Sequence, residues 1–275
     1  CKTGYHRIGY QCFEIPDDDR PNYGALFYTG FNNPYNIYQS FTNDFITLIG
    51  NGYVLEFWFM IDNVIYTEFD DNEYYYYFLS NVHDLYVTKD SDNNLKYFYL
   101  FNKGKDNPDY TQEITHLVHQ YEWNKVVIFA DSTISGIKEI RLYINFDNDN
   151  KITFIVNQDN DLTLIYLAFC SHEPELSYPY CVSEGNAVKW ASAFYNNIRI
   201  WNIYTSTINT IQSYINGIYS EYPQSIILFY PLTIQYLDNN RMTNIMTNLE
   251  EHISFKCESG AKCVLYNKDN IIIYN

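Results

Sequence analysis

Acidic side chains are the commonest groups in this chain that could do chemistry, because 33 Asp and Glu stand against 17 Lys and Arg. A retaining glycosidase needs two carboxyl groups about 5–5.5 Å apart across one sugar. Glu56 is followed by three aromatic residues rather than by a second acid, while Glu173 and Glu175 lie in a Pro-flanked loop. A nucleophile elbow, a phosphate-binding loop and an HExxH motif are all missing from the sequence. We therefore expect a protein that is not an enzyme.

The six cysteines offer a second kind of chemistry, oxidation to disulfides. They fall into three local couples, and we expect the pairs Cys1–Cys12, Cys170–Cys181 and Cys257–Cys263. The spacing leaves other connectivities open. An even number of cysteines favours an oxidising compartment, so the secretory pathway and an extracellular or cell-surface location are expected. The sequence has no CxxC spacing, which argues against a zinc site.

The net charge of −16, with a pI near 4.6, limits the possible partners. Such a charge repels nucleic-acid phosphates and anionic lipid, and it attracts Ca²⁺ or basic partners. Acid also keeps an aromatic-rich surface soluble, which is the simpler interpretation. No apolar run is long enough to cross a bilayer. The chain opens at a cysteine and ends in an interrupted strand, so we interpret it as a segment of a longer ectodomain.

Short blocks of alternating apolar and polar residues, separated by Asn, Asp and Gly, predict an all-β protein. Residues 53–62 are apolar on both faces, which predicts a central strand. Residues 85–101 and 137–156 each predict two strands around an acid–amide turn. The stretch 90–94 begins like an EF-hand loop but lacks its Gly and its final Glu, so a hairpin is the better interpretation. The predicted core residues are Phe57, Phe59, Ile140, Leu142, Ile198 and Ile200.

One short helix is expected at residues 205–217, where three Ile residues fall on one stripe and Gly217 can end the helix. A single helix among many strands predicts a decorated β-sandwich.

Aromatic residues supply the candidate binding surface, since the chain holds 30 Tyr and 18 Phe. Four consecutive tyrosines should send two rings to each face of a strand, and rings on a wet face can stack on a sugar or a protein. The segment 190–202 places further binding-type side chains opposite Ile198 and Ile200. Packing within the fold is the alternative role for both groups. The candidate surface residues are Tyr74, Tyr75, Tyr76, Tyr77, Tyr195, Arg199 and Trp201.

The order of these blocks resembles the laminin G-like and pentraxin-like members of the concanavalin A-like lectin/glucanase superfamily. The resemblance spans roughly residues 22–234 and rests on "EFWF" at 56–59, Trp123, "YIN" at 143–145 and "IRIWN" at 198–202. Phe146 departs from the family's usual Gly, so we expect the turn to move to residues 147–150. The resemblance implies an antiparallel jelly-roll sandwich in which residues 198–202 are a fold-building strand. Arg199 is then expected to pack against Tyr195 or Trp201 as a cation–π pair.

The resemblance also implies calcium at the sandwich rim, and the candidate ligands are Asp70, Asp71, Asn72, Asp147 and Asp149. The glucanase signature E-x-D-x-E is absent, so a glycoside hydrolase is the least favoured alternative. The ends resemble pieces of EGF-like or growth-factor-receptor-type cysteine-rich modules. We therefore divide the chain into 1–21, 22–256 and 257–275.

These observations predict a non-catalytic extracellular adhesion or structural module that contacts other protein chains or glycans. A calcium-dependent, lectin-like carbohydrate-binding domain is the alternative.

Overall fold

The computed structural model describes the backbone of residues 5–8, 11–14, 23–27, 36–49, 52–61, 74–101, 110–120, 122–131, 138–147, 149–156, 162–170, 182–183, 186–187, 189–191, 193–202, 209, 211–212, 226–230, 237–238, 241–243, 252–255, 263–267 and 270–274. Side chains are described at 41–49, 52–61, 74–101, 110–120, 122–131, 139–147, 149–155, 162–169, 191, 193–202, 209, 211–212 and 226–230.

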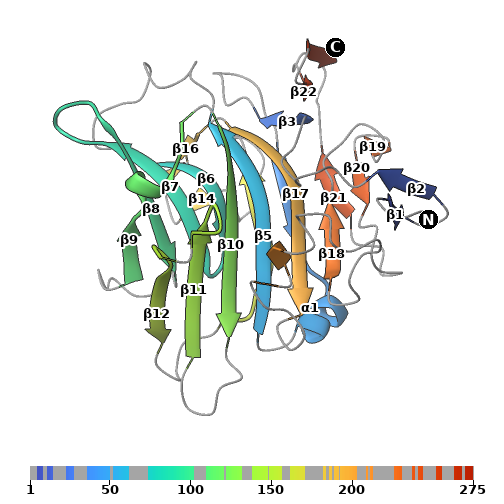
Figure 1. Ribbon diagram of the computed structural model, residues 1–275, viewed down its shortest axis with the longest axis horizontal. Coiled ribbons are helices and arrows are strands. Elements are labelled where there is room, and N and C mark those ends of the chain that lie inside the picture. The colour runs from blue at the N-terminus through green and yellow to red at the C-terminus, as the bar shows by residue number, and fades with distance from the viewer. Residues whose placement is uncertain are drawn as a thin grey trace.

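The described strands form two large sheets, as the alternating sequence predicts (Figure 1). Sheet 1 follows the order β12-β11-β10-β5-β17-β3-β22-β23, with β18 also paired to β17. Its strands are β3 (Tyr23–Phe27), β5 (Gly52–Ile61), β10 (Trp123–Asp131), β11 (Lys138–Ile144), β12 (Ile152–Val156), β17 (Ala193–Asn202), β18 (Ile226–Tyr230), β22 (Cys263–Asn267) and β23 (Asn270–Tyr274). The predicted central strand is therefore confirmed, because β5 lies between β10 and β17.

Sheet 2 follows the order β19-β20-β21-β4-β13-β6-β7-β8-β9, with β16 also paired to β6. Its strands are β4 (Asn36–Ser40), β6 (Tyr75–Ser80), β7 (His83–Lys89), β8 (Leu95–Phe101), β9 (Thr111–Glu113), β13 (Tyr166–Cys170), β16 (Lys189–Trp190), β19 (Leu237–Asp238), β20 (Arg241–Thr243) and β21 (His252–Phe255). All described pairings in both sheets are antiparallel except the short one between β16 and β6. The predicted all-β, antiparallel jelly-roll sandwich is confirmed.

Two small hairpins lie outside these sheets. They pair β1 (Tyr5–Ile8) with β2 (Gln11–Glu14), and β14 (Val182–Ser183) with β15 (Asn186–Ala187). At the other end of the chain, β22 pairs with β3 inside sheet 1. The division of the chain at residues 21 and 256 stays a prediction.

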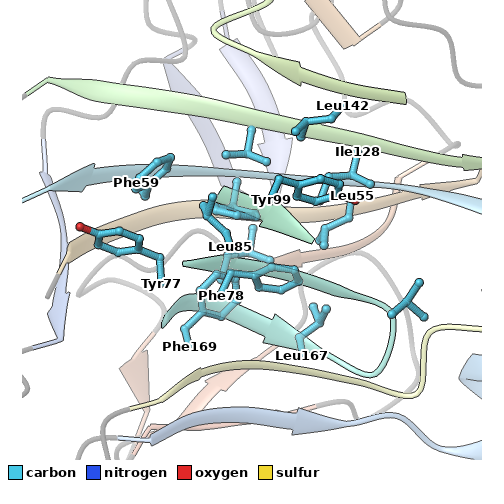
Figure 2. Packing of buried hydrophobic residues seen from close by; sticks show 14 of the residues in the cluster. Leu55, Phe59, Tyr77, Phe78, Leu85, Tyr99, Ile128, Leu142, Leu167 and Phe169 are labelled. Atoms are coloured by element: carbon cyan, nitrogen blue, oxygen red, sulfur yellow. The ribbon is translucent and has the colours of Figure 1, made fainter. Parts of the chain in front are cut away.

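The hydrophobic core lies between the two sheets and draws on both (Figure 2). Phe57 of β5 lies 5.3 Å, between ring centroids, from both Phe78 of β6 and Phe169 of β13. The predicted core residues all belong to this cluster and are at most 1% exposed: Phe57, Phe59, Ile140, Leu142, Ile198 and Ile200. Aromatic and β-branched side chains suit this packing because they fill space on a pleated surface.

Polar contacts also join the two sheets inside the core. The imidazole of buried His83 on β7 lies 2.6 Å, through Nε2, from the hydroxyl of Tyr53 on β5, and its Nδ1 contacts the hydroxyl of Tyr99 on β8. Elsewhere, the Tyr195 hydroxyl on β17 donates to the carbonyl oxygen of Tyr77 on β6 over 2.7 Å. Burial lowers the pKa of His83 to about 3, so its ring is neutral at neutral pH.

Both predicted hairpins are present, and their acid–amide turns close in the same way. In the β7–β8 turn, Asp90 Oδ1 accepts from the backbone N–H groups of Asp92 and Asn94. In the β11–β12 turn, Asp147 Oδ1 accepts from the N–H groups of Asp149 and Asn150. Both arrangements are local side-chain turns that substitute for a backbone turn.

The helical segments differ in part from the prediction. An unpredicted helix, α1 (Asn43–Ile49), buries Phe45 and Ile49. The Thr42 hydroxyl accepts from the N–H of Phe45 and so caps its start. A short 3-10 helix, η3, spans Thr115–Leu117. Within the expected helix 205–217, the described residues 209, 211 and 212 are helical.

A bulge in β17 decides which side chains face the core. The pairing of β17 with β5 shifts register between Asn196 and Arg199, and Asn197 has a φ of 47°. The extra residue reverses the alternation, so Tyr195 faces the core together with Ile198 and Ile200. Asparagine tolerates this left-handed conformation better than most residues.

Candidate functional site

An aromatic row crosses the outer face of sheet 2, on the side opposite the core. It consists of Tyr74, Tyr76, Tyr86 and Phe98, which come from the start of β6, from β7 and from β8. Tyr76 pairs in register with Tyr86, and Tyr86 pairs with Phe98. Tyr74 is 55% exposed, whereas the other three rings are half-buried. Cross-strand pairs on one face touch in this way because directly opposed residues are close neighbours.

The rings of the aromatic row touch one another in sequence. The Tyr74 and Tyr86 centroids are 5.2 Å apart with the ring planes at 79°, which is an edge-on contact. Tyr76 lies 5.5 Å from Tyr86 at 46°, and Phe98 stacks on Tyr86 at 5.5 Å and 15°. These separations fall in the range where aromatic pairs attract. Contacts between neighbouring rings thus help to hold the row in place, while the Tyr74 ring remains largely exposed to solvent.

Acidic groups flank the aromatic row. Buried Asp84 precedes Tyr86 by two residues on the same face of β7, and exposed Glu113 of β9 pairs in register with Phe98. Burial, together with Asp84 and the Tyr74 ring, raises the pKa of Tyr86 to about 12. Burial and Asp84 also raise the pKa of Tyr76 well above its usual value. Both hydroxyls therefore stay protonated and can donate hydrogen bonds at neutral pH.

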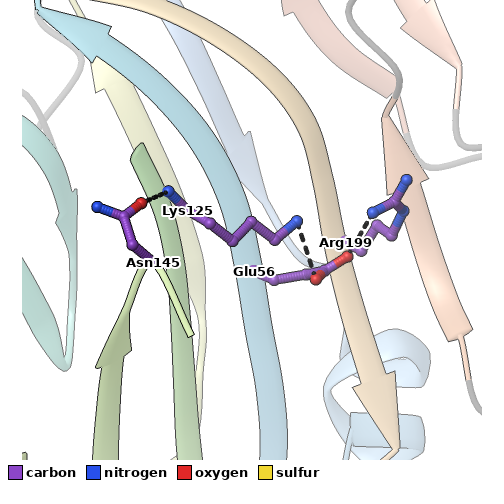
Figure 3. Close-up of polar contacts among 4 residues, drawn as sticks. All are labelled: Glu56, Lys125, Asn145 and Arg199. Atoms are coloured by element: carbon purple, nitrogen blue, oxygen red, sulfur yellow. Dashed lines mark hydrogen bonds and ion pairs between the residues drawn. The ribbon is translucent and has the colours of Figure 1, made fainter. Parts of the chain in front are cut away.

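The outer face of sheet 1 carries a buried charged triad, in contrast to this open row (Figure 3). Glu56 on β5 lies between Arg199 on β17, whose Nη1 is 2.6 Å from Oε1, and Lys125 on β10, whose Nζ is 3.0 Å from Oε2. All three side chains are at most 1% exposed. The backbone N–H of Lys125 donates to the Asn145 side chain over 2.8 Å, which joins β10 to the end of β11.

A second hydrophobic cluster surrounds the triad, and we call this side the closed face of sheet 1. Its members are Val54, Trp58, Trp123, Val127, Phe129, Tyr143, Phe194, Trp201, Ile211, Ile226 and Phe229. Lys125 Nζ lies 5.1 Å from the ring centre of Trp58, and Arg199 Cζ lies 4.3 Å from that of Phe229. The expected cation–π contact of Arg199 is therefore present, but its partner is Phe229 rather than Tyr195 or Trp201.

The structure divides the predicted surface residues into two groups. Tyr74 and Tyr76 lie on the aromatic row, as an alternating strand requires. Five others are buried, and their assignment to a binding surface was wrong: Tyr75, Tyr77, Tyr195, Arg199 and Trp201. The first three face the core between the sheets, and the last two belong to the closed face of sheet 1. Sequence alternation alone does not reveal whether a second apolar layer covers the outer side of a strand.

The candidate calcium ligands are only partly described. Asp147 and Asp149 lie in the β11–β12 turn, where Asp147 Oδ2 also accepts from the Asn150 side chain over 2.6 Å. Its turn hydrogen bonds lower the pKa of Asp147, so this carboxylate is ionised. Asp70, Asp71 and Asn72 lie outside the described residues. Within the described part of the chain, no three His, Cys, Asp or Glu side chains gather where a metal ion could bind.

The predicted disulfides also lie outside the described part of the chain. Cys12, Cys170 and Cys263 are placed by their backbone alone, on β2, β13 and β22, and Cys1, Cys181 and Cys257 are not described. The three pairings stay predictions. Over the described residues, no helix is long and apolar enough to span a membrane.

Comparison with known proteins gave likeness in fold only. No family model and no curated protein matches the chain. A native heptameric SAP-like pentraxin from Limulus polyphemus is 10% identical, with a TM-score of 0.38 over 71% of this chain and 82% of that chain. The binding domain of botulinum neurotoxin DC in complex with SialylT is 11% identical, with a TM-score of 0.40 over 86% of this chain and 58% of that chain.

The enzymatically active domain of bacteriophage CBA120 tailspike protein 2 is 12% identical, with a TM-score of 0.37 over 82% of this chain and 34% of that chain. Likenesses of this strength say nothing about the ligand or the activity of this chain.

Sequence reasoning missed Tyr86, Phe98 and Glu113, which complete the surface around Tyr74. A signal was available in the two arms of the predicted hairpin 85–101, since Tyr86 and Phe98 are the outward aromatic residues of that hairpin. Only the observed register, however, places them beside the tyrosines of β6.

Proposed function

We propose that this chain is a non-catalytic extracellular adhesion or structural module, and that it contacts its partner through the aromatic row of sheet 2. The observation that supports this most is the open row itself, with Tyr74 more than half exposed in a protein that buries most of its described aromatic residues. Tyrosine suits such contacts because its large ring loses little rotamer entropy and its hydroxyl stays wet.

The surroundings of Glu56, on the central strand β5, support a non-catalytic role. Glu56 is fully buried, and each of its oxygen atoms lies against a cation of the same chain. A carboxylate held between two cations and shielded from solvent is a structural group, whereas a general acid must reach a substrate. Glu56 therefore stabilises the sheet rather than acting on a ligand.

The experiment is a binding screen on the intact chain with immobilised probes: neutral, sialylated and amino-sugar glycans, and basic and acidic polypeptides, each with and without Ca²⁺. We expect at least one probe to bind, and we expect the Tyr74→Ala/Tyr86→Ala variant to lose that binding. The matched control is Ile155→Ala, which removes an apolar side chain that is 71% exposed on sheet 1 and should bind as the parent chain does.

Three outcomes would contradict the proposal. One is a failure of all probes to bind, and another is binding that survives the double tyrosine variant unchanged. The third is turnover of a polysaccharide by the parent chain, which would make it an enzyme. Binding that needs Ca²⁺ would instead support the lectin-like form of the module.

A further inference from the structure

We infer that the aromatic row binds the ammonium or guanidinium group of a Lys or Arg side chain on a basic segment of a partner protein. This inference rests on the proposed function and specifies its ligand. Three observations support this inference: the aromatic–cation contacts elsewhere on this molecule, the arrangement of the rings, and the negative charge of the nearby carboxylates and of the whole chain.

The closed face of sheet 1 shows what the outward aromatic residues of this protein pair with. Besides the contacts of Lys125 and Arg199, Arg141 Cζ lies 4.9 Å from the ring centre of Phe129, its register partner on β10. All three contacts place a cation over a ring within cation–π distance. On sheet 1, the chain itself therefore supplies a cation for each of these outward rings.

The aromatic row on sheet 2 differs in this respect. Among the described side chains, no cation lies over the rings of Tyr74, Tyr86 or Phe98. Lys96 is on the same face of β8, but its register partner is Thr88, next to the β7–β8 turn. The rings of Tyr74, Tyr86 and Phe98 therefore offer to a partner the kind of contact that the closed face makes internally.

The arrangement of the rings favours a compact cation over a flat sugar. Tyr74 stands edge-on to Tyr86 at 79°, so these two rings form a corner rather than a shared platform. A corner of aromatic faces with carboxylates nearby is the physical arrangement that holds an organic cation. Sugar stacking instead requires one ring that lies flat and open.

Charge favours the same ligand. Exposed Glu113 lies at the far end of the row, and Asp84, only 2% exposed, lies beneath it on the same face as Tyr86. The chain as a whole carries a net charge of −16, which steers a basic partner towards it and repels an acidic one. A basic protein segment therefore gains both from the overall field and from the local rings.

The test uses short oligolysine and oligoarginine peptides, with the same oligolysine acetylated on its side chains as the neutral control. The variants are Tyr74→Leu, which removes the π face without changing charge, and Tyr74→Phe, which keeps it. We expect Tyr74→Leu to weaken oligolysine binding about two- to fivefold in calorimetry and Tyr74→Phe to leave it unchanged. Because Tyr→Leu leaves the net charge alone, any loss reports on the ring rather than on the acidic surface.

A second readout is the NMR shift of the lysine ε-methylene protons, which move upfield when they lie over an aromatic ring. We expect this shift with the parent chain and with Tyr74→Phe, and its reduction with Tyr74→Leu. Ile155→Leu on sheet 1 is the matched control and should change neither readout. Glu113→Gln should weaken binding modestly, and the difference should shrink in high salt.

The outcomes separate this inference from the proposed function. Equal binding of the acetylated peptide, or binding of the basic peptides that is insensitive to Tyr74→Leu, would overturn the cation contact. A neutral glycan that binds in a Tyr74-dependent way would overturn it as well, while leaving the proposed contact role of the row intact. Failure of every glycan and peptide to bind would overturn both.

Discussion

The outer faces of the two sheets are built from the same kinds of side chain but differ in their exposure to solvent. On sheet 1, aromatic residues cover Glu56, Lys125 and Arg199, which are at most 1% exposed. On sheet 2, the row around Tyr86 stays half-open, and Tyr74 is 55% exposed. Aromatic content therefore does not mark a binding surface in this protein. Among the described side chains, cations lie over Trp58, Phe129 and Phe229 on sheet 1, whereas none lies over Tyr74, Tyr86 or Phe98 on sheet 2.

This difference also separates stabilising residues from contact residues. A buried ion pair loses its hydration, and breaking it leaves an uncompensated charge in an apolar layer. A half-exposed ring keeps much of its solvent contact, so its removal changes the folded state little. The closed face should thus be sensitive to substitution in stability, and the aromatic row in binding.

The largest expected effect is at the centre of the closed face. Glu56→Gln should lower the free energy of unfolding by about 3–5 kcal/mol, because it leaves Lys125 and Arg199 buried without their counter-charge. Chemical denaturation measures this change. The matched control is Glu139→Gln, whose partner Arg141 is 3.5 Å away in a pair that is more than a quarter exposed. That control should cost less than about 1 kcal/mol, and equal losses for the two variants would contradict the assigned difference.

The layer between the two faces should respond to acid. His83 has a folded-state pKa of about 3 against an ordinary value of 6.5, so between these values the unfolded chain binds a proton that the folded chain does not. The stability linked to His83 is therefore complete above about pH 6.5 and declines as pH falls towards 3, by up to about 1.4 kcal/mol per pH unit. The measurement compares denaturation of the parent chain and His83→Gln across this range. The parent should show the steeper decline, and parallel curves would exclude His83 as its source.

A smaller effect is expected at the bulge that separates the inward from the outward residues of β17. Asn197→Ala should cost about 1 kcal/mol of stability, because alanine is disfavoured at a φ of 47°. Asn197→Gly should retain more stability than the alanine variant, since glycine adopts this conformation without a steric cost. Thermal unfolding of both variants checks the order, and a more stable alanine variant would argue against backbone strain as the cause.

The smallest expected effect on stability is at the open row. Tyr74→Ala should change the free energy of unfolding by less than about 0.5 kcal/mol, because the ring is largely exposed. Phe229→Ala, which removes a ring on the closed face that is 3% exposed, should cost about 3–5 kcal/mol. Denaturation of this pair compares the two faces directly, and similar losses would remove the distinction between them.

The sequence predicted those features that depend on near neighbours. Alternation placed Ile198 and Ile200 in the core, and the acid–amide turns located both hairpins. It did not locate α1, which has only seven residues and too few apolar positions to show a helical period. The candidate site was harder to predict, because only the observed strand register brings Tyr76 and Phe98 beside Tyr86. The charged triad was equally hidden, since the partner of Arg199 is Glu56, 143 positions away. The bulge at Asn197 also reverses a face assignment in a way that no local pattern indicates.

The hydrogen bonds that cross the core between the sheets have a mechanical consequence. Dispersion contacts between two apolar layers have little preferred direction, so they define the alignment of the layers less sharply than hydrogen bonds do. The bonds from Tyr53 and Tyr99 to His83, and from Tyr195 to the Tyr77 carbonyl, are directional and form at one alignment only. These hydrogen bonds therefore resist sliding of one sheet over the other. A force applied to sheet 2 at the aromatic row would therefore pass to sheet 1 through these bonds.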